Sequence, residues 1–96
     1  MTIFAILMPR PQPALAEKLG AVFKTDALKV TDTQWLVSAI GTAQEISMKI
    51  GVYDPDNPTA APVGEAIVFS TSGYFGLAPA NIWEWIKVRL ETVKSA

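Results

Sequence analysis

Residues 3–8 read IFAILM, and residues 35–40 read WLVSAI. Runs as continuously apolar as these are typical of strands that are buried on both faces of a sheet. Residues 66–71 form a third apolar run, and residues 28–31 alternate between apolar and polar side chains, which suits a short edge strand. We therefore expect the first two runs to be neighbouring central strands and the other two segments to be the edges.

Three helices are predicted around these strands. Pro13 suits the first turn of a helix, because its missing N–H has no partner there in any case. The next helix begins at Thr42, whose spacing to Glu45 is that of a capping box, and Gly51 can end it. Pro79 is predicted to open the last helix. Apolar positions at helical spacing predict two buried stripes, one formed by Leu15, Leu19, Val22 and Phe23 and the other by Ile82, Trp83, Ile86, Leu90 and Val93.

This order of elements predicts an α+β fold. Strand, helix, strand, strand, helix, strand with right-handed crossovers is a ferredoxin-like βαββαβ sandwich, with an added C-terminal helix. We expect a single domain over residues 1–96. Two crossover helices can cover only one face of the sheet, yet both faces of residues 3–8 are apolar. The second face must be covered by the last helix or by a partner chain, unless a different topology places helices on both faces.

Composition narrows the function classes. The chain has no histidine and no cysteine, which removes the commonest general base, the thiol nucleophile and disulfides. We expect no cofactor and no metal, and a non-enzymatic function is favoured. Eight basic and nine acidic residues give a net charge of −1, which disfavours nucleic acid as a partner. The apolar opening is too short to span a membrane, so a cytoplasmic location is expected.

The segment at residues 70–76 reads STSGYFG and is the most site-like part of the sequence. It follows a predicted strand and precedes a helix whose N-terminus could hold an anion. A structural turn that uses the two glycines is the alternative interpretation. Arg10, between two prolines, is a second candidate for binding an anion. The candidate ligand-binding residues are Ser70, Ser72, Gly73, Tyr74 and Arg10.

Half of the residues are apolar, which is rich for so short a chain and favours a homo-oligomer. Large apolar side chains on the shoulder of the last helix and in the preceding turn could join into one interface patch. The candidate interface residues are Trp85, Val88, Tyr74 and Phe75.

Carboxylates are the remaining candidates for chemistry. Five of them lie in predicted loops or at element ends. Mg²⁺ prefers oxygen ligands, so one interpretation is a carboxylate site for this ion. The other interpretation is that they are solvated turn residues. The five are Asp26, Asp32, Asp54, Asp56 and Glu65. Three hypotheses follow. The first is a non-enzymatic interaction or regulatory module that acts as a homodimer and can bind a protein partner. The second is a metal-dependent nuclease or phosphoryl-transfer enzyme with carboxylates at a dimer interface, and the third is a small-ligand sensor that uses residues 70–76.

The predicted topology resembles that of RNA-recognition motifs and of small dimeric nucleases of the CRISPR-adaptation and antitoxin type. RNA-recognition motifs carry basic and aromatic residues on the third strand, where this chain has WLVSAI. The CRISPR nucleases usually carry an acidic residue near the end of the first strand, where this chain has Met8, Pro9 and Arg10. The resemblance therefore concerns the fold and carries no function with it.

Overall fold

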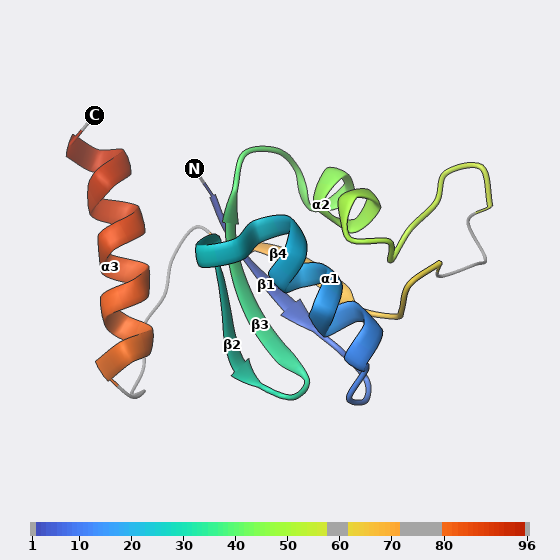
Figure 1. The fold of residues 1–96 in the computed structure, drawn as a ribbon. Helices are drawn as coiled ribbons and strands as arrows, with labels where there is room; N and C mark the ends of the chain where they lie inside the picture. Colours follow the sequence, from blue (N-terminus) through green and yellow to red (C-terminus); the bar gives the residue numbers. More distant parts are fainter. Residues whose placement is uncertain (1, 58–61, 72–79, 96) are drawn as a thin grey trace.

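The computed structural model describes residues 2–57, 62–71 and 80–95, with the side chains of the last helix described as far as Val88. It is a mixed α+β structure with a four-stranded antiparallel sheet and three α-helices (Figure 1). The strands are β1 (Thr2–Leu7), β2 (Ala27–Thr31), β3 (Gln34–Ala39) and β4 (Ile67–Thr71). The helices are α1 (Pro13–Phe23), α2 (Ala43–Lys49) and α3 (Ala80–Ser95), and a short 3₁₀ turn, η1 (Lys24–Asp26), follows α1.

The sheet has the strand order β2-β3-β1-β4. β1 pairs with β3 from Thr2 opposite Ala39 to Leu7 opposite Gln34, and with β4 on its other side. The two most apolar runs of the sequence are therefore neighbours, and each is flanked by strands on both sides, as predicted. Such strands lose the most contact with water, which explains why they are the most apolar.

Helices α1 and α2 cover one face of the sheet. The core beneath them contains Phe4 and Ile6 of β1, Leu15 and Leu19 of α1, and Ile46 of α2. The predicted stripe of α1 is confirmed, because Leu15, Leu19 and Phe23 are buried and Val22 packs against the core. In α2 the capping box is present: the Glu45 N–H donates to Thr42 Oγ1 and the Thr42 N–H donates to Glu45 Oε1, both at 3.1 Å.

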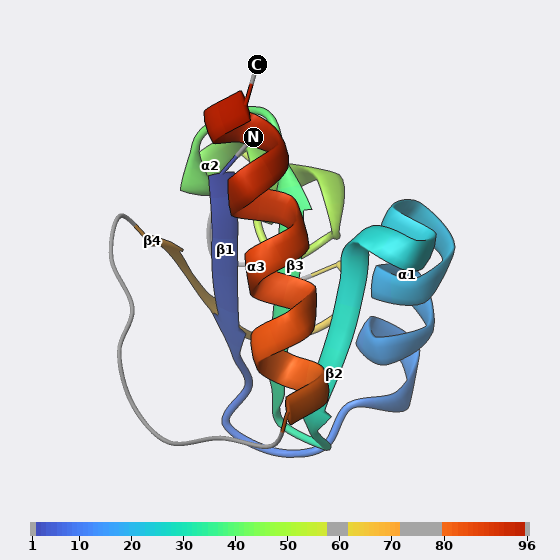
Figure 2. The same ribbon diagram turned by 90° about the vertical axis from the view of Figure 1, so that its left-hand side faces the viewer.

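Helix α3 lies on the opposite face of the sheet, in front of β1, β3 and β2 in Figure 2. Its Ile86 is buried, and the Trp85 indole N–H donates to the Thr25 carbonyl oxygen at 3.4 Å. Ile3 and Ser38, which point to this second face, are also buried. The last helix therefore covers part of the second face, which was one of the alternatives that the sequence left open.

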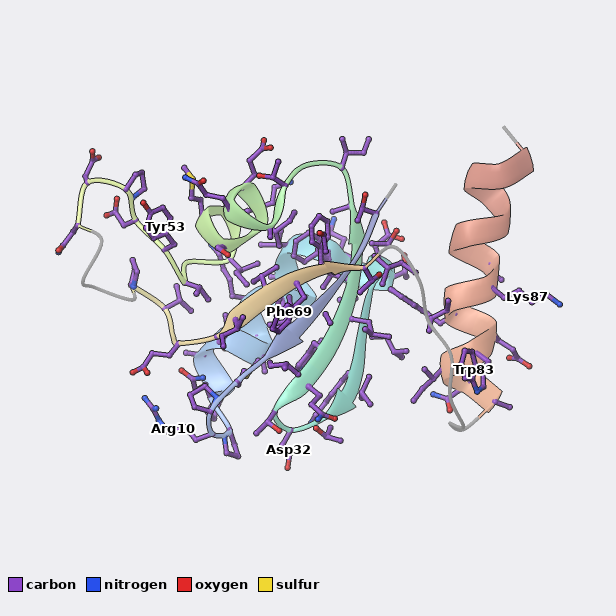
Figure 3. All side chains as sticks on the ribbon, turned by 180° about the vertical axis from the view of Figure 1, so that it is seen from behind. Arg10, Asp32, Tyr53, Phe69, Trp83 and Lys87 are labelled. Carbon is purple, nitrogen blue, oxygen red and sulfur yellow. The ribbon has the colours of Figure 1, made fainter. Side chains whose placement is uncertain are left out.

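Some predicted features lie outside the described residues. These are the opening of the last helix at Pro79, the turn after Thr71, and the side chains of Leu90 and Val93 in the predicted stripe of α3. Of that stripe, Ile86 is buried and Ile82 and Trp83 are half-buried, while Lys87 points away from the sheet (Figure 3). No described helix has the length and apolar character required to cross a lipid bilayer.

Candidate interaction surface

Three large apolar side chains remain exposed where α3 does not cover the sheet. They are Leu7 of β1 and Ile67 and Phe69 of β4, with 40%, 59% and 48% of their surface exposed. Side chains alternate between the two faces of a strand, so all three lie on the face opposite the core residues Phe4 and Ile6. Leu7 is directly opposite Ile67 in the register, and Phe69 is two residues further along β4. We call this contiguous set the β4 strip; Phe69, its member furthest along β4, is labelled in Figure 3.

A shallow hollow continues the β4 strip at the end of β1. It has a volume of about 350 Å³, and most of its lining is apolar. Leu7 and Ile67 of the strip contribute to it, together with Met8, Pro9 and Ala66, and Glu65 stands at its border. The hollow therefore extends the exposed apolar surface beyond the three side chains of the strip.

The outer edge of β4 is the second element of this surface. The Met8 N–H donates to the Thr33 carbonyl oxygen on the β3 side at 2.8 Å. In an antiparallel sheet the backbone groups of successive residues point to alternate neighbours, so Ile3, Ala5 and Leu7 bond to β4. The backbone groups of Val68 and Ser70 therefore point outward. None of the described strands pairs with them.

A second hollow lies beside this edge on the helix side of the sheet. It has a volume of about 500 Å³ and runs between α2, the segment after α2, and the first half of β4. Its polar lining comes from Gln44 and Ser47 of α2 and from Tyr53, and Val52 and Val68 supply apolar surface. The edge of β4 is thus bordered by open space along its first half.

Arg10 contacts its own chain. Its guanidinium lies 3.3 Å from the Glu65 carboxylate, and both side chains are largely exposed. The Gln12 side chain makes two hydrogen bonds to the backbone of Glu65. Gln12 Nε2 donates to the Glu65 carbonyl oxygen at 2.6 Å, and Gln12 Oε1 accepts from the Glu65 N–H at 2.7 Å. A Cβ on Gly64 would lie 2.7 Å from Gln12 Oε1, so a side chain at this position would push the Gln12 amide aside. The contacts of Arg10 and Gln12 with Glu65 therefore join the proline-rich linker to the segment before β4.

The other predicted ligand-binding residues are only partly described. Ser70 is exposed on β4, while Ser72, Gly73 and Tyr74 lie outside the described residues. Thr71, which lies between Ser70 and Ser72, donates its hydroxyl to the Ile3 carbonyl oxygen at 2.7 Å. The predicted grouping of these residues therefore stays a prediction.

The predicted interface on α3 is likewise described in part. Val88 is 60% exposed. Trp85 is half-buried and its indole contacts η1 of its own chain through the bond to Thr25. Tyr74 and Phe75 lie outside the described residues. Of the predicted patch, Val88 is the described residue that is mainly exposed.

Two of the candidate carboxylates, Asp32 and Asp54, are found in local contacts. Asp32 pairs with Lys29 at 2.9 Å, and Asp54 Oδ1 accepts from the Asp56 N–H at 2.9 Å in a turn. In the part of the chain that the structure describes, no three metal-ligating side chains come together. Two buried polar atoms, Trp35 Nε1 and Ser38 Oγ, have no hydrogen-bond partner among the described residues.

The β4 strip was not among the interface residues predicted from the sequence. Its signal was present in the apolar run at residues 66–71, which was predicted to be an edge strand and yet carries no ionisable side chain. Exposed edge strands usually carry charges or proline that prevent pairing with other chains. Comparison with protein-family models, with curated proteins and with solved structures found no match to this chain.

Proposed function

We propose that this chain is a small protein-interaction module that works as a homodimer and makes its contacts through the β4 strip. The observation that carries the proposal is the contiguous exposure of Leu7 on β1 and of Ile67 and Phe69 on β4, an edge strand that lacks charges. Exposed apolar surface of this kind, next to an open strand edge, is typical of association sites. The proposed function is non-enzymatic, and the proposed location of the protein is the cytoplasm.

The fold that we propose for the module is the ferredoxin-like sandwich with an added C-terminal helix. The strand order β2-β3-β1-β4 supports it, and so does the placement of α1 and α2 on one face. In this arrangement α3 is the addition, and its position decides how much of the second face is left for a partner. Helix α3 leaves β4, the edge strand next to β1, uncovered.

Removing the β4 strip from water contributes favourably to the free energy of association. About half of each of the three side chains is exposed. Covering that surface contributes on the order of 1 kcal/mol for each side chain. Association also carries a cost of several kcal/mol in lost freedom of motion, so we expect a reversible complex.

Sedimentation velocity over a range of micromolar concentrations tests this proposal. We expect the wild-type chain to form dimers, and Phe69→Ser to shift the equilibrium toward monomer. Val88→Ser is the matched control, because it removes a similarly exposed apolar side chain from α3. A wild type that stays monomeric at the highest concentration would show that the homodimer does not exist. Dimers that respond to Val88→Ser and not to Phe69→Ser would place the contact on α3.

A further inference from the structure

We infer that two copies of this chain join edge to edge through β4, as antiparallel strands related by a two-fold axis at Phe69. The four strands of each copy would then form one continuous sheet. This inference rests on the proposed homodimer and specifies how its two copies pair.

The backbone geometry sets the register of this pairing. Val68 and Ser70 direct their N–H and C=O groups outward, while Phe69 bonds inward to Ala5. A two-fold axis at Phe69 places Val68 of one copy opposite Ser70 of the other, and these two residues exchange both backbone hydrogen bonds. Because the axis generates this pair twice, the outward groups of both residues are satisfied in both copies.

The side chains fit the same register. Phe69 of one copy faces Phe69 of the other in a pair without hydrogen bonds, where side chains approach most closely. Ile67 faces Thr71 on the same face of the sheet, so the two β4 strips become neighbours. Aromatic pairs and pairs of aromatic with β-branched residues stabilise adjacent strands. No ionisable side chain lies between Ala66 and Thr71, so no like charges meet across the axis.

A second copy is favoured as the occupant because the segment is complementary to itself. Each described residue of β4 has a defined mate in the other copy, and isologous contacts of this kind produce closed dimers. The hollow beside Ala66 and Val68 leaves space along this half of the edge for the incoming strand.

The available area predicts a weak dimer. Even complete burial of both β4 strips would remove on the order of 500 Å² of apolar side chain from water. With the strand edges added, the interface stays below the roughly 1,200 Å² at which stable complexes begin. We therefore expect a dimer that dissociates on dilution within the micromolar range.

The first test uses proline at a position whose N–H points outward. Ser70→Pro keeps every strand bond within the monomer and removes two of the intermolecular bonds, one for each copy. Each such bond changes the dissociation constant by about a factor of five, so we expect the constant measured by sedimentation to rise by about twenty-five-fold. Ser70→Val is the matched control: it keeps the N–H, and its dimer should be at least as stable as the wild-type dimer. Circular dichroism verifies that both variants are folded.

The second test uses the absence of cysteine from the chain. In the predicted pair the two Cα atoms of Phe69 lie about 4.5 Å apart, which is within the range for a disulfide. We expect Phe69→Cys, oxidised with copper–phenanthroline, to form a covalent dimer. Val88→Cys, at a position that is somewhat more exposed than Phe69 but lies on α3, should remain mainly monomeric under the same conditions.

The two proposals fail in different ways. A wild type that is monomeric at every concentration overturns the homodimer and this pairing with it. A wild-type dimer that persists in Ser70→Pro, together with no cross-link through Phe69→Cys, leaves the homodimer intact and overturns the pairing through β4. Covalent capture of Val88→Cys in place of Phe69→Cys would overturn it as well.

Discussion

At the scale of single residues, Gly51 shows how one backbone position joins two distant segments. It follows α2 with a φ of +80°, a conformation that side chains other than hydrogen disfavour. Its carbonyl oxygen accepts from the Val63 N–H at 2.8 Å. A Cβ at this position would lie 2.3 Å from Val63 Cγ2. Glycine is therefore required both by the turn and by the contact.

We expect Gly51→Ala to lower the free energy of unfolding by about 2–4 kcal/mol, from backbone strain and from the clash with Val63. Gly20→Ala is the matched control. Gly20 lies within α1 and a Cβ there meets nothing within 4 Å, so alanine should raise the stability by about 0.5–1 kcal/mol. Urea unfolding followed by tryptophan fluorescence measures the free energy of unfolding of both variants. Equal effects of the two substitutions would contradict the described conformation of Gly51.

At the scale of elements, α2 depends on its capping box. The helix has only seven residues, so few of its backbone groups are bonded within the helix and the cap satisfies a large share of the rest. Its single buried side chain is Ile46, which ties the helix to the core. The position of α2 in turn shapes the hollow beside β4, because Gln44 and Ser47 line it.

Removing the cap should destabilise the domain through α2. We expect Thr42→Ala to lower the free energy of unfolding by about 1 kcal/mol, because the Glu45 N–H loses its acceptor. Thr42→Ser keeps the hydroxyl and should stay within a few tenths of a kcal/mol of the wild type. Thermal unfolding by circular dichroism compares the three proteins. If serine is as damaging as alanine, the hydroxyl is not the stabilising group.

At the scale of the whole molecule, the position of α3 decides which part of the sheet is available. Helix α3 buries Ile86 and leaves the β4 strip exposed, so the same chain has one closed and one open region on its second face. If α3 lay further toward β4, Ile67 and Phe69 would be covered. The proposed association surface is thus a consequence of where this helix packs.

Docking of α3 can be measured through Ile86. We expect Ile86→Ala to cost about 2–5 kcal/mol of unfolding free energy, since it removes buried methyl and methylene groups. Val88→Ala, at an exposed position on the same helix, should change it by no more than about 0.5 kcal/mol. Urea unfolding measures both variants. Similar small effects of the two substitutions would mean that α3 is not packed on the sheet in solution.

Much of the fold could be predicted from the sequence because its signals are local. Alternation or continuity of apolar residues over five or six positions identified the strands, and the greater hydrophobicity of residues 3–8 and 35–40 predicted that they are central. The capping box of Thr42 and Glu45 and the stripe of α1 likewise depend on side chains within one or two helical turns of each other. Such patterns act through neighbours along the chain, so the linear sequence contains them.

The exposure of the candidate surface was decided by tertiary structure, although the uncharged run at residues 66–71 was already predicted to be an edge strand. Phe69 has the same neighbours in sequence whether α3 covers it or not, and its exposure depends on how residues 80–88 pack on the second face. The contact of Arg10 with Glu65 and that of Gly51 with Val63 also join residues far apart in the chain. The packing of distant segments on the same face of the sheet determines which apolar side chains remain exposed to water. Local sequence patterns do not contain this information.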